Sequence, residues 1–304
     1  MLQNAHLRMC VDPQGGSLLS LVSLQHQQPV LREGQGKQPG DCGLFPMLPL
    51  ANRVAGNRFL LRGEEVVLPQ HEADDKFFLH GDGWLRRWEV VNATQSGCLL
   101  RLRGWHPCGY DYTAQLCYQL EASSLHASLT LTHSGERPML YGCGFHPFFA
   151  FDARSTAQFS ASGYWPEGAQ HLPLPWQHDI PPAADFTRAQ YGEDAWLNVG
   201  YSGWGGQAVI QRDVMKLTIL AQTPCLMLFR MSGEEFLCLE PQTHPVNAHH
   251  MPGQPGFIAR LSPPNGRESW FCTPRAGWRS VISPTFLATG FFCLSGACGS
   301  KGWG

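Results

Sequence analysis

Four short segments of the sequence set an ionisable side chain among aromatic residues, glycine and proline. They read ANRVAGNRF at 51–59, LHGDGW at 79–84, GFHPFF at 144–149 and LEPQTHP at 239–245. This mixture is typical of the strand ends and loops that build a concave binding site. These segments are therefore the first candidates for a functional site.

Glu240 and His146 are the side chains of these segments best suited to move protons near neutral pH. A carboxylate and an imidazole can act as general base and general acid once their pKa values are brought near neutrality. The residue types alone also fit a plainer interpretation. Glu240 would then be a surface carboxylate beside a turn-forming proline, and His146 a histidine packed among the phenylalanines of its segment.

Arg53 and His80 lie in the two remaining segments. Arg53 fits either a ligand-binding guanidinium or a structural ion pair. His80 precedes a glycine in a predicted loop, so it fits either a ligand or a turn residue.

Three histidines lie close after Glu240 and raise the question of a metal site: His244, His249 and His250. No His-Glu-x-x-His helix is present, and Pro241 and Pro245 break the segment. We therefore expect no metal.

The elements that must position these residues are predicted to be strands. Apolar residues alternate with polar ones at Tyr112, Ala114, Leu116, Tyr118 and Leu120, and again at Leu125, Ala127, Leu129 and Leu131. Further strand-like runs cover 99–103, 216–221 and 226–230, and Gly or Pro interrupts the chain about every ten residues. The pattern predicts an all-β protein, a large antiparallel β-sandwich with few short helices.

Composition excludes several classes of protein. The 304 residues are 43% hydrophobic and 15% charged, which permits a sizeable core. A net charge of −2 supplies no broad positive field, so we expect neither nucleic acid nor a membrane surface as partner. The sequence lacks an apolar run of about 20 residues and a signal-peptide pattern at its start, so we expect a cytoplasmic protein.

The eleven cysteines include no CxxC pair and are odd in number. Reduced, mostly buried thiols are the simplest interpretation, with disulfides or a metal cluster as alternatives.

Two regions bear on domain organisation. Residues 166–182 are rich in proline and polar residues and predict a long surface loop, because strand-like sequence resumes after them. From residue 263 onward the alternation dissolves. We predict one sandwich domain over 1–262 and an atypical tail over 263–304 that packs loosely and contributes nothing to the chemistry.

Taken in order, the motifs resemble the aldose 1-epimerase family. The residues are Asn-Arg with a following Gly and Phe, His-Gly with downstream Trp88, His-Pro-Phe-Phe and Glu-Pro-Gln, after a hairpin-like opening at 11–21. The resemblance covers roughly residues 5–260. It implies a galactose-mutarotase-like sandwich with a sugar in a cleft on one sheet, a small-molecule sugar as partner, and no metal or organic cofactor.

The resemblance also implies an activity and roles. The family interconverts the α and β anomers of a free sugar, with Glu240 matching the general base and His146 the general acid. Arg53 and His80 match ligands of sugar hydroxyl groups.

One position departs from the family pattern. Asn198 stands where the family commonly has Asp, just before a Tyr-Ser-Gly-Trp stretch that ends at Trp204. An amide can donate and accept hydrogen bonds but carries no charge, so the departure bears on the identity of the sugar more than on the reaction. Asn198 and Trp204 complete the predicted sugar-binding residues, although buried tryptophans belong more often to a core.

Two other functions stay open at this level. The chain could be a non-catalytic carbohydrate-binding or regulatory protein, although binding alone needs no acid and base pair. A hexose-phosphate epimerase would require an Arg or Lys cluster, and Arg86 with Arg87 is the only adjacent basic pair near a motif. The sequence leaves the sugar and the oligomeric state open.

Overall fold

The computed structural model describes residues 1–71, 73–251, 259–261 and 285–286, and the regular secondary structure of this part of the chain consists almost wholly of antiparallel strands. Its helices are single 3-10 turns: η1 (Ala55–Asn57), η2 (Ala169–His171), η3 (Pro182–Ala184) and η4 (Ala248–His250). None of the helices in these ranges is long and apolar enough to cross a membrane.

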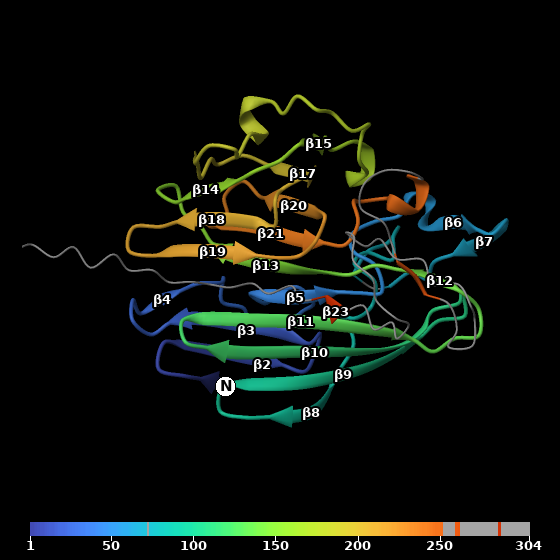
Figure 1. The fold of residues 1–304 in the computed structure, drawn as a ribbon, viewed down its shortest axis with the longest axis horizontal. Helices are drawn as coiled ribbons and strands as arrows, with labels where there is room; N and C mark the ends of the chain where they lie inside the picture. The colour runs from blue at the N-terminus through green and yellow to red at the C-terminus, as the bar shows by residue number, and fades with distance from the viewer. Residues whose placement is uncertain (72, 252–258, 262–284, 287–304) are drawn as a thin grey trace, which may run out of the picture.

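A ten-stranded sheet runs through the whole molecule (Figure 1). Its order is β1 (Leu2–Gln3), β2 (Leu7–Asp12), β3 (Ser17–Ser23), β5 (Leu44–Met47), β13 (Gly144–Ala150), β21 (Phe236–Gln242), β20 (Cys225–Arg230), β17 (Leu197–Ser202) and β15 (Gly163–Trp165), with β4 (Gln28–Pro29) paired to β3.

Two smaller sheets pack on one face of the large sheet (Figure 1). The first is ordered β23 (Thr285–Phe286), β11 (Ser124–His133), β10 (Asp111–Glu121), β9 (Gly97–Trp105), β8 (Glu89–Ala93). The second is ordered β16 (Gln190–Tyr191), β14 (Thr156–Phe159), β18 (Gln207–Gln211), β19 (Lys216–Leu220). Two-stranded ribbons join β12 (Met139–Tyr141) to β22 (Ala259–Leu261) and β6 (Arg58–Leu61) to β7 (Glu64–Val67).

The predicted all-β antiparallel sandwich is therefore confirmed, and alternation places its core. Every second residue of β10, from Tyr112 to Leu120, is buried in the main apolar cluster, as the pattern predicted. Such a strand has one face toward the core and one toward solvent. The same rule applied to β21 sends Leu237 and Leu239 into that cluster and turns Cys238 and Glu240 to the opposite face of the sheet.

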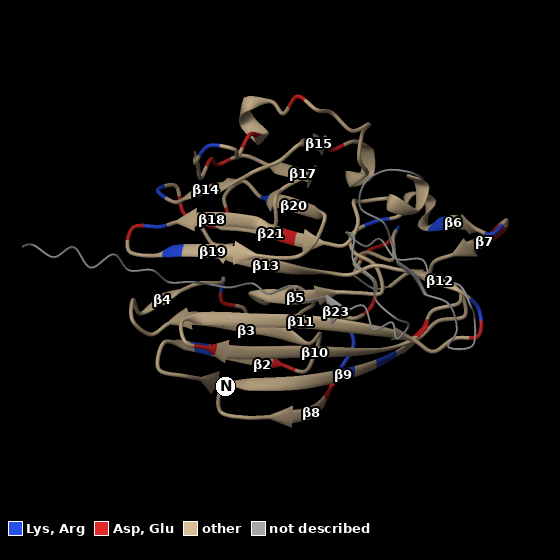
Figure 2. Ribbon diagram, viewed as in Figure 1, with Lys and Arg blue, Asp and Glu red and all other residues tan. Residues whose placement is uncertain are grey.

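Charged residues gather in loops and at strand ends, and Figure 2 also shows an acidic position within β21. The eight cysteines among the described residues are free, and most are buried. Of the tail predicted over 263–304, the described part is β23, which pairs with β11; the rest lies outside the described residues.

Candidate active site

His146 and Glu240 meet on adjacent strands of the large sheet. The register of β13 and β21 pairs Gly144 with Gln242 and Phe148 with Cys238, so His146 stands opposite Glu240. His146 Nε2 lies 3.2 Å from Glu240 Oε1, and the two side chains are 9% and 2% exposed. Opposed residues of an antiparallel pair share one face, which is why two positions far apart in the sequence come into contact.

The row of opposed residues continues on both sides of the pair. Phe45 on β5 stands opposite His146, and Met227 on β20 stands opposite Glu240. Gly200 on β17 stands opposite Met227. The pair is thus the centre of a row that crosses five strands on the face away from the main core.

Burial sets the protonation of the pair. Loss of water around the carboxyl raises the pKa of Glu240 to about 8, against the hydrogen bond from the Gln242 amide at 3.0 Å and the charge of Arg53. Burial, and then the charge of Arg32, lowers the pKa of His146 to about 3. Between these two values the pair holds one proton, and burial favours the uncharged form with the proton on Glu240.

Aromatic rings hold the imidazole in place. Phe45 and Phe148 stack on His146 with ring centroids 4.6 Å and 4.5 Å away and interplanar angles of 26° and 27°. Flat contacts of this kind fix the ring plane and keep water away from it.

His80 approaches the pair from a loop bonded to the segment that holds Arg53. The backbone N–H of Asn52 donates to His80 Nδ1 at 3.1 Å, and the backbone N–H of His80 donates to the backbone carbonyl of Asn52 at 3.0 Å. The His80 and His146 ring centroids are 5.3 Å apart. Burial lowers the pKa of His80 well below its usual value, so His80 is neutral and its Nε2 is left as an N–H donor.

Gly81 lets these two loops approach so closely. Its φ is +68°, and a Cβ at this position would lie 2.1 Å from the Leu48 carbonyl oxygen. Only glycine avoids both the strain and the clash. Arg53 on the neighbouring segment donates to the Asn52 side chain at 3.1 Å, and its charge acts on both Glu240 and His146.

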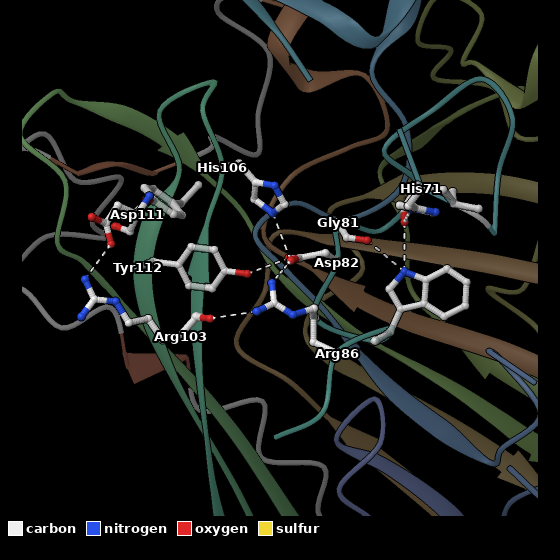
Figure 3. Close-up of polar contacts among 12 residues, drawn as sticks. His71, Gly81, Asp82, Arg86, Arg103, His106, Asp111 and Tyr112 are labelled. Atoms are coloured by element: carbon white, nitrogen blue, oxygen red, sulfur yellow. Dashed lines mark hydrogen bonds and ion pairs between the residues drawn. The ribbon is translucent and has the colours of Figure 1, made fainter. Parts of the chain in front are cut away.

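Asp82 anchors the His80 loop to the five-stranded sheet (Figure 3). Its carboxylate accepts hydrogen bonds from Tyr112 Oη at 2.9 Å, Arg86 Nη1 at 2.9 Å and His106 Nε2 at 3.0 Å. Burial alone would raise the pKa of Asp82, but these hydrogen bonds and charges outweigh it and lower that pKa. Asp82 is therefore an ionised positioning residue that is hydrogen-bonded through both of its carboxylate oxygens.

Asn198 lies on the same face as the pair, at the β17 end of the row. Its Nδ2 donates to Glu167 Oε1 at 2.5 Å, which brings in a carboxylate from the 166–182 loop. Trp204 lies elsewhere: its indole N–H donates to the Thr223 carbonyl, and the side chain, 1% exposed, packs in the main core. The structure therefore groups five of the six predicted site residues and leaves Trp204 apart from them.

Three residues on this face were not anticipated from sequence: Cys238 beside the pair, and Glu167 and Trp196 at the β17 end of the row. Glu167 sits in a loop without periodicity, so no pattern could have selected it. Cys238, two positions before Glu240, could have been found from the alternation of β21, which puts both on one face.

Cys238, His146 and Glu240 also form a potential donor set for a metal ion. Their ligand atoms all lie within 4.8 Å of one another, and a sulfur, a nitrogen and an oxygen suit a zinc-like ion. An ion held through His146 Nε2 and Glu240 Oε1, the atoms that face each other, would exclude proton transfer by the pair. Of the histidines after Glu240, His244 Nε2 accepts from the Ala51 backbone amide at 3.2 Å and His250 Nε2 lies 2.8 Å from the Arg58 carbonyl oxygen. The ring nitrogens of His249 are buried and have no hydrogen-bond partner among the described residues.

The chain is similar to known proteins in both sequence and fold. Residues 1–258 match the family model described as aldose 1-epimerase. The uncharacterised Escherichia coli K12 protein YphB is 33% identical over 277 residues, covering 86% of this chain and 93% of YphB.

Two crystal structures show how far the likeness extends. A "Putative aldose 1-epimerase" of Escherichia coli K12 has a TM-score of 0.81 and 31% identity, over 86% of this chain and 93% of that one. The GalM/aldose epimerase homologue of C. elegans has a TM-score of 0.73 over 87% of this chain and 94% of that one, and at 17% identity it shows the fold alone.

The anchoring role of Asp82 predicts that Asp82→Asn lowers the unfolding free energy by about 2 kcal/mol, because three donors lose a charged acceptor. If the protein turns over a sugar, its KM should rise more than its kcat falls, since the loop that presents His80 loosens. Thermal melting and steady-state kinetics measure both effects. Asp179→Asn, at a fully exposed carboxylate, is the matched control. Unchanged melting and KM in Asp82→Asn would contradict the anchoring role.

The raised pKa of Glu240 predicts a pH-dependent stability that needs no substrate to measure. Above pH 7 the unfolded chain has lost this proton while the folded chain keeps it until about pH 8. Stability from the bound proton is therefore lost as pH rises through that value. The unfolding free energy of the wild type should fall relative to Glu240→Gln by about 1 kcal/mol from pH 7 to pH 8. Parallel urea-denaturation curves across this range would mean that Glu240 is already ionised at pH 7.

Proposed function

Because the chain belongs to the aldose 1-epimerase family, we propose that it catalyses the interconversion of the α and β anomers of a free sugar. The observation that supports this most directly is the buried His146–Glu240 pair, 3.2 Å apart, which shares a single proton. A binding protein has no need of such a pair, because neutral hydrogen-bonding groups bind sugars without the energetic cost of burying ionisable ones.

Opening of the pyranose ring requires one proton to leave and one to arrive. The base takes the proton from the anomeric hydroxyl, the C1–O5 bond breaks as C1 becomes an aldehyde, and the acid gives a proton to O5. Rotation about the C1–C2 bond turns the aldehyde over. Ring closure then runs the same transfers in reverse and regenerates both groups.

The pair already contains the proton that this cycle needs. With Glu240 as base and His146 as acid, the active form carries the proton on His146, and the empty site favours the proton on Glu240. The two forms have the same total charge and differ by one proton moved across 3.2 Å. The positive charge of Arg53 favours the Glu240 carboxylate but also disfavours a protonated His146, so it acts on both members of the pair.

His80 and Arg53 are proposed to bind the sugar hydroxyl groups. His80 offers a neutral N–H donor, and Arg53 offers charged donors. Both come from loops bonded to each other, so they present donors at a fixed spacing beside the pair.

The acid and base roles predict large losses in two variants. Glu240→Gln and His146→Asn should each lower the anomer-exchange rate at least about a hundredfold while sugar affinity changes little, because neither replacement can transfer the proton. The double variant should lose far less than the product of the single losses, since the residues act as a unit. Exchange of freshly dissolved α-sugars, followed by NMR or polarimetry with EDTA present to exclude metal catalysis, measures the rates. Wild-type protein that binds sugars and leaves exchange at its buffer rate would instead be a carbohydrate-binding module.

The shared proton predicts a one-sided pH profile around neutrality. Above about pH 8 the pair loses its last proton, so no acid is left and kcat/KM should fall tenfold per pH unit. The lower limb lies near pH 3, where the pair gains a second proton. A pH series of anomer-exchange rates, corrected for buffer catalysis, tests this, and a rate that keeps rising through pH 9 would contradict it.

A further inference from the structure

Glu167 reaches the catalytic face from a loop outside every motif. Three protein groups donate to its carboxylate: Asn198 Nδ2 and His171 Nδ1, each at 2.5 Å from Oε1, and Trp196 Nε1 at 2.7 Å from Oε2. The Glu167 side chain nevertheless remains 22% exposed. The hydrogen bonds outweigh partial burial and lower the pKa of Glu167, so the group is ionised at neutral pH.

This carboxylate lies at a defined place relative to the catalytic pair. Glu167 and Asn198 line a hollow together with Gly200 and Met227, which continue the row of His146 and Glu240. The strand β17 is two strands away from β21, or about 10 Å. A pyranose that is hydrogen-bonded to Glu240 through its anomeric hydroxyl group and to Glu167 through a hydroxyl group at its far end can bridge this distance, because the two hydrogen bonds add roughly 5 Å to the length of the sugar.

Aromatic side chains in contact with one another connect the His146–Glu240 pair to the hollow at Glu167. The ring centroids of Trp196 and Phe229 are 5.2 Å apart, and those of Phe229 and His146 are 6.4 Å apart. Trp196 is 47% exposed and is fixed by its bond to Glu167. An exposed, fixed indole beside a carboxylate offers a surface for the C–H face of a sugar ring.

The hydrogen bonds between Glu167 and its neighbours leave acceptor atoms free in the hollow, so the hollow suits a ligand that donates hydrogen bonds. A carboxylate only accepts, so the Asn198 atom that faces it is the NH2 group, and Asn198 Oδ1 is left as an acceptor. Three of about four acceptor positions on Glu167 are used, which leaves one. Sugar hydroxyl groups can donate to both acceptors, whereas a phosphate dianion has no proton to donate.

Among the described residues that line the hollow, none is a lysine or an arginine. Arg230, on the neighbouring strand, donates to the Ala195 carbonyl and lies near Glu193. Arg86, of the basic pair noted in the sequence, is bonded to Asp82 on the other side of the site. The basic groups that act on Glu167 are His171, which already donates to its carboxylate, and Arg53, whose charge also acts on Glu240. An anionic group at the far end of the sugar would therefore meet a carboxylate and no free basic side chain of the described hollow lining.

We propose that Glu167, with Asn198, forms the subsite for the end of the sugar away from the anomeric carbon and restricts the protein to uncharged sugars. This inference rests on the proposed anomer exchange and adds the class of substrate and the residue that selects it. Sugars phosphorylated at C6 and uronic acids are excluded by charge.

The test compares matched pairs of sugars: glucose and galactose, each with its 6-phosphate. NMR gives both the anomer-exchange kcat/KM and the Kd, and the Kd requires no turnover. The wild type should prefer the uncharged member by about tenfold or more, because two like charges meet in a partly exposed site. Glu167→Gln should reduce that preference at least about fivefold, while Asp179→Asn on the same loop leaves it unchanged.

A charge swap between Glu167 and Asn198 tests the subsite more stringently than the single variant. Asn198→Asp alone sets two carboxylates against each other and should weaken sugar binding. Combined with Glu167→Gln, it restores one carboxylate and one amide and should recover both binding and the preference for uncharged sugars, which a loss of folding could not do.

The outcomes separate this inference from the proposed function. Wild-type protein that binds uncharged sugars selectively and does not exchange their anomers would reject the enzyme activity and keep the subsite. Equal preference for sugar and sugar phosphate in the wild type, or an unchanged preference in Glu167→Gln, would reject the subsite and keep the activity. Absence of binding by all four sugars would overturn both.

Discussion

Glu240 lies almost wholly out of contact with water, and its carboxyl group faces the Nε2 of His146 at 3.2 Å. A lone buried charge is costly, so burial drives both groups toward their neutral forms and the pair toward a single shared proton. The same burial that opposes ionisation makes the pair sensitive to any new donor or acceptor brought into contact with it. A sugar hydroxyl group entering the site is such a donor and acceptor.

The large sheet can bury the His146–Glu240 pair outside the main core because its two faces pack against different parts of the chain. One face packs on two smaller sheets and supplies the main core, and the other carries the row that includes Phe45, His146 and Glu240. Strand register fixes spacings across the row that loops could not hold. Loops then supply the remaining groups, and each is tied down: the His80 loop by Asp82, and the 166–182 loop by the bond from Asn198 to Glu167.

The two ends of the row differ in polarity. At its β5 end the imidazole lies against phenylalanine rings, which exclude water and fix the ring plane. At its β17 end an ionised carboxylate and an exposed indole stand beside an amide. In the proposed function, proton transfer in a low dielectric and recognition by polar acceptors are therefore about two strands apart, a separation that a sugar hydrogen-bonded at both ends can bridge.

Alternation of apolar residues was enough to predict strands such as β10 and the side of each that enters the core, because period two is a local property of an extended chain. The order of the motifs singled out Glu240, His146, Arg53 and His80 as candidate site residues. The sequence could not show that His146 contacts Glu240, that Trp204 belongs to the core while Trp196 lies by the site, or that Glu167 supplies a carboxylate next to Asn198. Those facts depend on which distant strands pair and in what register, and on how a loop without periodicity folds back. Burial, which shifts the pKa values of the pair, exists only once that pairing has removed water.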